Sequence, residues 1–173
     1  GTLLVDDCDF EDNIANERGG AFHMQKHHRA TIVNSRLKKN RAMFGGALSS
    51  ESASAIQIRN CAFSSNSADD AGGGIWLTAG RCWIGRSVFE YNQARYNGGA
   101  AGAAGGDLFF WRSEVKRNRV KGFGGGLYAV GTSQVIANYS KIHGNRAGVN
   151  GGALFADSGS SIKSSVGCTT SAR

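Results

Sequence analysis

Proline is absent from this sequence of 173 residues, and cysteine is scarce. The four cysteines, at spacings that match no zinc or thioredoxin pattern, are Cys8, Cys61, Cys82 and Cys168. This argues against a disulfide scaffold and a metal site, and we expect neither metal nor cofactor. No apolar run reaches the roughly 18 residues of a membrane-spanning helix, and no signal peptide opens the chain. We therefore expect no direct insertion of this segment into a membrane.

Glycine, in contrast, is abundant, with 26 residues. The glycines occur in clusters and not at every third position, which excludes a collagen helix. Apolar residues make up 40% of the chain and recur regularly, which argues against disorder. The backbone must therefore bend often without proline. The net charge of +7 favours an anionic partner, such as an acidic polysaccharide, a nucleic acid or a membrane surface.

A repeat with a period of 26 or 27 residues runs through the chain. It is marked by asparagines at Asn13, Asn40, Asn66, Asn92, Asn118 and Asn145. An apolar residue, here called the anchor, stands three positions before each asparagine, at Phe10, Leu37, Phe63, Phe89, Val115 and Ile142. A Gly-Gly pair follows each asparagine, beginning at Gly19, Gly45, Gly72, Gly98, Gly124 and Gly151. Matches at a constant period indicate that the chain consists of equivalent units.

Leucine-rich repeats, helical repeats and β-helices all have periods of this order. Helical repeats are excluded by the paired glycines and by the strand-like alternation of apolar residues at 55–58. The leucine-rich frame L-x-x-L-x-L is absent. The sequence therefore predicts an all-β fold, a right-handed parallel β-helix (solenoid) of about six coils of 26–27 residues, with three short strands each.

Equivalent positions of successive coils then form columns along the solenoid. The residues seven and five positions before each anchor are mostly apolar and are expected to point inward, as is the residue that follows each glycine-rich bend. Two positions before the anchor stands Cys or Ser, small enough for the inside of a bend. Each recurrent asparagine is expected in a turn, in the left-handed conformation, with its side chain bonded to the asparagine of the next coil.

Residues 1–173 are interpreted as a single β-helix segment. Inward positions are already occupied at Leu3 and Val5, and Cys168 takes the seventh anchor position. Open ends of a β-helix invite edge-to-edge pairing, and native solenoids cover them. We therefore expect further coils on both sides, so that the segment is a fragment of a longer solenoid.

The pattern Phe-x-x-Asn, followed by Gly-Gly-Ala and an aliphatic residue, resembles the repeats of the chlamydial polymorphic outer membrane proteins, which carry FxxN and GGA[ILV] motifs. Residues 10–13, 63–66 and 89–92 match the first motif, and residues 46–48 and 152–154 come close to the second. The resemblance implies a β-helix of the pectate-lyase-like superfold, exposed at the cell surface as the passenger of an autotransporter. It also implies an extracellular location and a role in adhesion.

Acidic residues cluster near the start of the chain, at Asp6, Asp7, Asp9, Glu11 and Asp12. In β-helix polysaccharide lyases, carboxylates on an outer face bind calcium while a basic residue removes a proton. The alignment of coils offers a structural alternative, since it places the following pairs side by side: Asp9–Arg36, Glu11–Lys38, Asp12–Lys39, Glu90–Lys116 and Glu114–Lys141. We favour structural pairing, worth about 0.2–1 kcal/mol per pair, over catalysis.

Basic residues form two groups that are candidates for contact with an acidic glycan. They are Lys26 and Arg29 in the first group, and Lys116, Arg117, Arg119 and Lys121 in the second. A solvated surface is the alternative interpretation, and no nucleic acid is expected because no RNA- or DNA-binding signature accompanies them. Asn138 begins the only N-glycosylation sequon, Asn-Tyr-Ser.

An apolar stripe is expected to face outward six positions before the anchors. It comprises Trp83, Phe109, Ile136 and Ile162, with Trp111 nearby. Such a stripe usually marks a contact surface for another domain or subunit, although a loop of the same chain that covers it is the alternative. The sequence thus predicts a non-catalytic structural or adhesive module of an extracellular surface protein or filament, which assembles with other subunits or flanking coils. A polysaccharide-active or acidic-glycan-binding β-helix is the second hypothesis.

Overall fold

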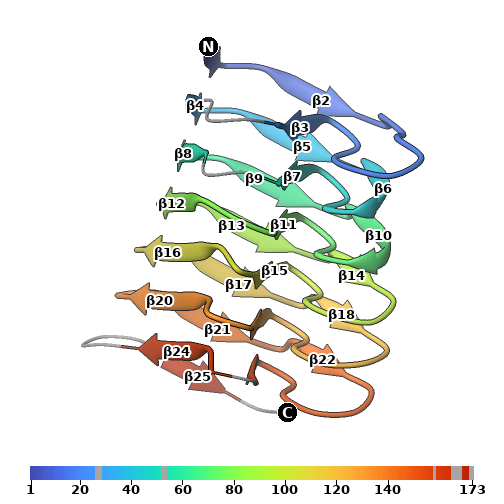
Figure 1. Cartoon of the computed structure of the whole chain (residues 1–173), viewed down its shortest axis with the longest axis vertical. Coiled ribbons are helices and arrows are strands. Elements are labelled where there is room, and N and C mark those ends of the chain that lie inside the picture. Colours follow the sequence, from blue (N-terminus) through green and yellow to red (C-terminus); the bar gives the residue numbers. More distant parts are fainter. Residues whose placement is uncertain (26–28, 52–53, 158, 165–168, 172–173) are drawn as a thin grey trace.

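In the computed structural model the chain winds into a stack of coils, each lying directly on the previous one (Figure 1). The structure describes residues 1–25, 29–51, 54–157, 159–164 and 169–171. The strands form four parallel sheets, here called A to D, in which each strand pairs with the equivalent strand of the neighbouring coil. Within the described ranges, no helix is long and apolar enough to cross a bilayer.

Each sheet takes one strand from successive coils. Sheet A contains β1 (Thr2–Asp6), β4 (Arg29–Val33), β8 (Ala55–Arg59), β12 (Arg81–Gly85), β16 (Asp107–Trp111), β20 (Gln134–Asn138) and β24 (Ser161–Ser164). Sheet B contains β2 (Asp9–Glu11), β5 (Arg36–Lys38), β9 (Ala62–Ser64), β13 (Val88–Glu90), β17 (Glu114–Lys116), β21 (Lys141–His143) and β25 (Thr169–Ser171). Sheet C contains β6 (Arg41–Phe44), β10 (Ser67–Ala71), β14 (Gln93–Ala94), β18 (Arg119–Val120) and β22 (Arg146–Ala147). Sheet D contains β3 (Phe22–Met24), β7 (Leu48–Ser50), β11 (Ile75–Leu77), β15 (Ala101–Ala104), β19 (Leu127–Val130) and β23 (Leu154–Ala156).

This architecture confirms the predicted all-β parallel solenoid but not the number of strands per coil. The central coils have four strands where three were expected, and the additional strand is that of sheet C. It starts directly after the recurrent asparagine and is only two residues long in β14, β18 and β22. A strand this short leaves no alternation of apolar and polar residues from which it can be predicted.

The main hydrophobic core lies inside the coils, where the inward columns of sheets A, B and D meet, while the inward residues of sheet C form a separate small cluster. Side chains from sheets A, B and D, such as Ile58, Phe63 and Leu48, are fully buried. Equivalent residues stack on one another, as shown by the rings of Phe63 and Phe89, whose centroids lie 4.5 Å apart with an interplanar angle of 6°. Burying each such side chain stabilises the fold by about 1.5–3 kcal/mol.

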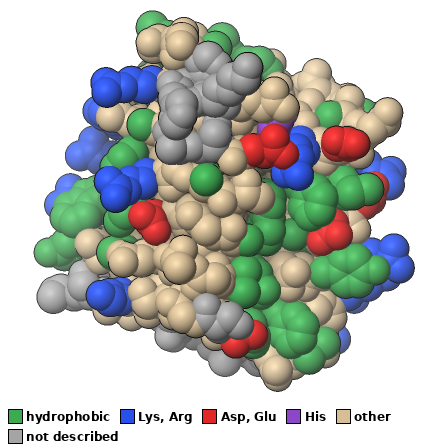
Figure 2. Space-filling view, in the orientation of Figure 1, with side chains coloured by type: hydrophobic (Ala, Val, Ile, Leu, Met, Phe, Trp, Pro, Cys, Tyr) green, Lys and Arg blue, Asp and Glu red, His purple; other side chains and the backbone are tan. Residues whose placement is uncertain are grey.

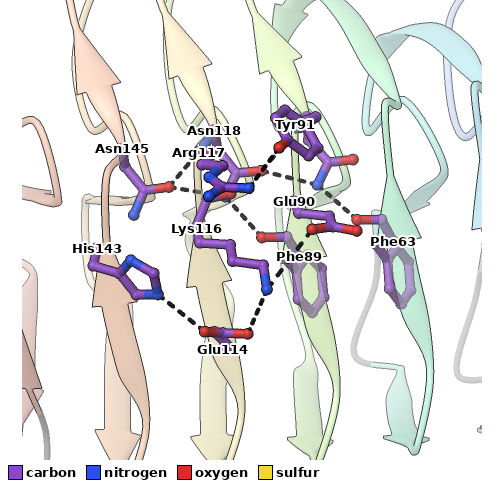
Figure 3. Close-up of polar contacts among 11 residues, drawn as sticks. Phe63, Phe89, Glu90, Tyr91, Glu114, Lys116, Arg117, Asn118, His143 and Asn145 are labelled. Atoms are coloured by element: carbon purple, nitrogen blue, oxygen red, sulfur yellow. Dashed lines mark hydrogen bonds and ion pairs between the residues drawn. The ribbon is translucent and has the colours of Figure 1, made fainter.

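The six recurrent asparagines lie in one column at the turn between sheets B and C. In the middle of the column, Asn92 Nδ2 donates to Asn118 Oδ1 at 3.0 Å and to the carbonyl of Phe63 at 2.9 Å. Its own Oδ1 accepts from Nδ2 of Asn66 at 2.9 Å. Figure 3 shows the part of this column that ends at Asn145. The column therefore joins six successive coils through amide groups, which are buried in its middle from Asn40 to Asn118.

The asparagines themselves do not adopt the left-handed conformation, which corrects the expectation from the sequence. That conformation belongs to the preceding residue, for example Lys39 with φ of 53° and Arg117 with φ of 54°. The physical reason is that the outward-pointing preceding residue makes the bend. This leaves the asparagine side chain directed into the coil, where it reaches the next amide.

The glycine pair is required by the close stacking of coils. The first glycine has a positive φ, 64° at Gly98, and makes the second bend. At the second position, an added Cβ on Gly99 would lie 2.2 Å from the carbonyl oxygen of Gly125 in the next coil. Any side chain there would push the coils apart, which explains why the pair recurs in each of them.

Candidate functional site

The outer face of sheet A carries a stacked pair of aromatic rings, of which Trp83 is exposed and Phe109 is half-buried. Trp83 of β12 and Phe109 of β16 are direct neighbours in the register, and their ring centroids lie 5.7 Å apart at an interplanar angle of 13°. Trp83 remains 41% exposed, and Trp111, at the end of β16, remains 44% exposed. The structure thus brings together three of the residues predicted for the partner face.

A groove of about 440 Å³ opens beside these rings. Gly85 lies in register with Arg59 on one side and Trp111 on the other. A Cβ at Gly85 would lie 3.9 Å from its nearest neighbour beyond the adjoining residues, Cγ of Arg59. The hollow therefore exists because this position has no side chain. Ile136, another predicted partner-face residue, also lines the groove.

The rim of the groove is aromatic and cationic. Tyr139 contacts Trp111 edge to face with centroids 4.6 Å apart, and the guanidinium of Arg112 lies 5.7 Å from the Trp111 ring centre. Arg59 donates from Nη2 to Oε1 of Gln57 at 2.8 Å, which holds its side chain along the rim. Tyrosine, tryptophan and arginine are the residue types that dominate binding energy at protein interfaces.

Ile162 does not belong to this face, contrary to the prediction. It pairs in register with the inward Val135 and packs against the main core, whereas Lys163 occupies the outward position beside Ile136. The error came from counting back from Cys168 as the seventh anchor. Cys168 lies outside the described residues, and the anchor register continues from Ile142 to Thr170.

Three of the acidic residues near the start of the chain, Asp9, Glu11 and Asp12, are engaged in ion pairs with the next coil. The pairs formed as predicted are Asp9–Arg36 at 2.5 Å, Glu11–Lys38 at 2.9 Å, Asp12–Lys39 at 3.9 Å and Glu90–Lys116 at 3.8 Å. Hydrogen bonds from Arg36 lower the pKa of Asp9; desolvation opposes them, and the charges of Arg36 and Lys38 add to the lowering. These carboxylates are therefore held by basic neighbours.

Glu114 departs from the predicted pairing with Lys141. Although the two residues are register neighbours, the Glu114 carboxylate lies 2.8 Å from Nζ of Lys116 and 2.9 Å from Nε2 of His143 (Figure 3). Hydrogen bonds from His143 and then from Lys116 lower the pKa of Glu114. Lys116 also reaches Glu90, so that this part of sheet B carries a shared network of charges.

Of the two basic groups predicted to contact an acidic glycan, the structure describes one member of the first and divides the second between two faces. Lys26 lies outside the described residues, and Arg29 is exposed at the start of β4. Lys116 is bound to carboxylates on sheet B. Arg117, in the turn after β17, donates from Nη1 to the Tyr91 hydroxyl at 2.7 Å.

Arg119 and Lys121 lie on a different face, that of sheet C. Lys121 lines a hollow together with Arg95, while Arg119 is the register neighbour of Arg146. The sequence missed Arg95 and Arg146 because they are 51 residues apart, and only the stacking of coils brings them onto one face. The signal was present in the repeat: Arg119 and Arg146 stand at equivalent positions after Asn118 and Asn145.

A second aromatic stack, which the sequence analysis did not identify, lies outside sheet D. The rings of Trp76 and Tyr128 lie 6.3 Å apart, and those of Tyr128 and Phe155 lie 5.6 Å apart. Gly102 separates Trp76 from Tyr128, and a Cβ there would lie 2.6 Å from the Trp76 ring. Figure 2 shows hydrophobic side chains gathered on the face that includes this sheet. Trp76 is only 6% exposed, so this stack is mostly covered by its own neighbours.

His23, Ser49 and Glu51 form a small polar cluster at the edge of this stack. Nδ1 of His23 lies 2.7 Å from Oγ of Ser49, and its Nε2 lies 3.7 Å from a carboxylate oxygen of Glu51, which also pairs with Arg18. The order of groups resembles that of a nucleophilic triad. Ser49, however, is fully buried, so its hydroxyl is not accessible to a substrate.

Three cysteines are described, and all have free thiols. Cys61 and Cys82 are buried, Cys8 is half-buried, and burial raises the pKa of the two buried thiols. Asn138, the sequon asparagine, is half-buried at the edge of the groove on sheet A, and Ser140 is fully buried. In the part of the chain that is described, no group of three or more His, Cys, Asp or Glu residues is placed to hold a metal ion.

A stack of parallel coils, joined by an internal asparagine column and carrying a groove on one outer face, defines a β-solenoid protein. Residues 1–170 match the family described as the right handed beta helix region, and the chain belongs to this family. Comparisons with curated proteins and with solved structures gave no match. The family match concerns the coils, and the resemblance to the chlamydial outer membrane proteins stays a prediction.

Proposed function

We propose that this β-helix is a non-catalytic structural module of an extracellular surface protein or filament, and that it assembles with a second copy of itself through the groove on sheet A. The observation that carries the proposal is the exposed Trp83–Phe109 stack beside the hollow at Gly85. Half-exposed aromatic residues in a row mark interfaces more often than they mark free surface.

A second copy suits this face because the projecting Trp111 side chain and the hollow over Gly85 lie side by side. Trp111 projects from the end of β16, and the space over Gly85 is open next to it. In a two-fold symmetric contact the same surface patch of both copies meets, so Trp111 of each copy would enter the hollow of the other. Such a buried aromatic anchor in a pocket is typical of the residues that carry interface energy.

A structural role, as opposed to catalysis, is supported by the state of the carboxylates. Asp9 and Glu11 are bound to basic side chains of the next coil. Glu114 is bound to Lys116 and His143. Carboxylates that act in general acid or base catalysis must instead be free to meet the substrate.

The proposal is tested by sedimentation velocity over a range of protein concentrations. The wild-type chain is expected to form dimers as the concentration rises. The double variant Trp83→Ser/Phe109→Ser is expected to stay monomeric, since the aromatic surface that the partner covers is lost. Gly85→Trp, which fills the hollow without altering the exposed rings, is also expected to stay monomeric.

Ile14→Ser is the matched control, because Ile14 is 76% exposed and lies away from sheet A. It should dimerise like the wild type. A wild-type chain that remains monomeric at every concentration, or a Trp83→Ser/Phe109→Ser variant that dimerises unchanged, would show that the groove is not a self-association surface.

A further inference from the structure

The outer face of sheet C is dominated by basic side chains. Along the solenoid axis, one register row contains Arg41, Ser67, Gln93, Arg119 and Arg146. Beside this row, Arg95 and Lys121 line a hollow of about 660 Å³. Figure 2 shows Lys and Arg side chains along the right-hand edge of the molecule, on the side where sheet C lies in Figure 1.

The protein itself neutralises the positive charge of this face only in part, through Asp69, which pairs with Arg41, and Asp70, whose carboxylate interacts with the charge of Arg95. Arg119 and Arg146 are direct neighbours on parallel strands, and like charges in this position destabilise a sheet. Within the described residues, no carboxylate forms an ion pair with Arg119, Lys121 or Arg146. Asp69, which lines the hollow, is bound to Arg41 at 2.8 Å. An anion on this face would therefore remove a repulsion that the fold leaves in place.

We propose that the outer face of sheet C binds a linear acidic polysaccharide that runs along the solenoid axis. Neighbouring coils are separated by about 4.8 Å, so the row presents one side chain per coil at a regular short interval, with guanidinium groups adjacent at Arg119 and Arg146. Polyuronates and sulfated polysaccharides carry anionic groups on successive sugar rings, which suits such a row. Guanidinium groups bind carboxylates through paired N–H donors, and Ser67 and Gln93 offer hydrogen bonds to sugar hydroxyls.

A polysaccharide fits this face better than a nucleic acid does. Recognition of single strands relies on aromatic side chains on which bases stack. The described residues that line the hollow on sheet C include none. Double-stranded DNA is read by a helix or a two-stranded ribbon inserted in the major groove, whereas sheet C presents a continuous face of parallel strands.

The test is calorimetric titration of the chain with heparin, which carries sulfates and carboxylates, and with polygalacturonate, which carries carboxylates alone. We expect salt-dependent binding to at least one of them. The double variant Arg119→Gln/Arg146→Gln should bind about tenfold or more weakly, because two guanidinium contacts in one row are lost. Binding to heparin alone identifies sulfate as the recognised group, and binding to both identifies carboxylate.

Lys141→Gln/Lys163→Gln is the matched control, since it removes the same charge from exposed positions on sheets B and A. It should retain wild-type affinity. Equal weakening in both double variants, no binding to either polysaccharide, or tighter binding to a single-stranded oligonucleotide would each overturn the proposal. Self-association through Trp83 and Phe109 is measured separately, so the two proposals fail independently.

Discussion

At the scale of single residues, the inner asparagines of the column join the coils through buried side chains that have no water to bind. We predict that Asn92→Ala lowers the free energy of unfolding by at least about 2 kcal/mol, because each buried polar group left without a partner costs about 1–3 kcal/mol. The groups affected are the Phe63 carbonyl and the donors of Asn66. Urea denaturation followed by circular dichroism measures the change.

Asn13→Ala is the control within the same column. Asn13 is exposed, and its amide donates to Asn40 Oδ1 at 2.8 Å, at the edge of the described stack. Water replaces a partner there, so the loss should stay below about 1 kcal/mol. Equal losses for the two variants would mean that burial does not determine the strength of the column.

Gly99 and Gly85 differ clearly in the space that surrounds them and that a side chain could occupy. We predict that Gly99→Ala destabilises the fold by about 1–3 kcal/mol or more, because its Cβ would lie 2.2 Å from the Gly125 carbonyl oxygen. Gly85→Ala should be neutral or stabilising by about 0.4–1 kcal/mol, since its Cβ meets its nearest neighbour at 3.9 Å. Thermal unfolding midpoints of the two variants measure this. Similar midpoints would contradict the steric origin of the glycine pair.

At the scale of elements, the strands of sheet B are joined by charges that respond to pH. The pKa of Glu114 in β17 is lowered by His143 of β21 and by Lys116. A carboxylate with a lowered folded-state pKa stabilises the protein fully above its ordinary pKa of 4.5. That stability is lost as the pH falls through the lowered value. We therefore predict that Glu114→Gln is less stable than the wild type at neutral pH, and that the difference disappears in acid.

Urea denaturation at several pH values between neutral and strongly acidic measures this difference. Glu17→Gln is the control, since Glu17 is exposed in a loop after β2. Its difference from the wild type should stay nearly constant across the series. If the Glu114→Gln difference also stays constant, the network around Glu114 does not contribute through its charge.

The repeat was sufficient to predict the sheets whose inward residues form columns through successive coils. It was not sufficient to predict features that depend on the register of a single coil or on the neighbours of a single residue. The columns through Ile58 and Phe63 were predicted because identical residue types recur at a constant interval. Ile162 was misplaced because the last coil differs in length from the others. The hollow at Gly85 was not predicted either, since it depends on which neighbours surround a missing side chain.

At the scale of the whole molecule, the faces of the solenoid differ in chemistry although they share one repeat. Sheet A presents the aromatic groove, sheet B the ion pairs with the next coil, and sheet C the basic row in which Arg119 and Arg146 are adjacent. The inward columns specify the coil and are therefore similar in each. The outward columns are free to vary, and the differences among faces arise there.

The parallel pairing of every sheet along one axis has a mechanical consequence. A force that pulls the two ends apart along this axis loads the backbone hydrogen bonds of all four sheets lengthwise. It also loads the hydrogen bonds between the side-chain amides of the asparagine column. Coils contact only their immediate neighbours, so the load passes through each junction in series. Extension would then proceed by the rupture of one junction at a time, beginning at the weakest, while the remaining coils stay wound.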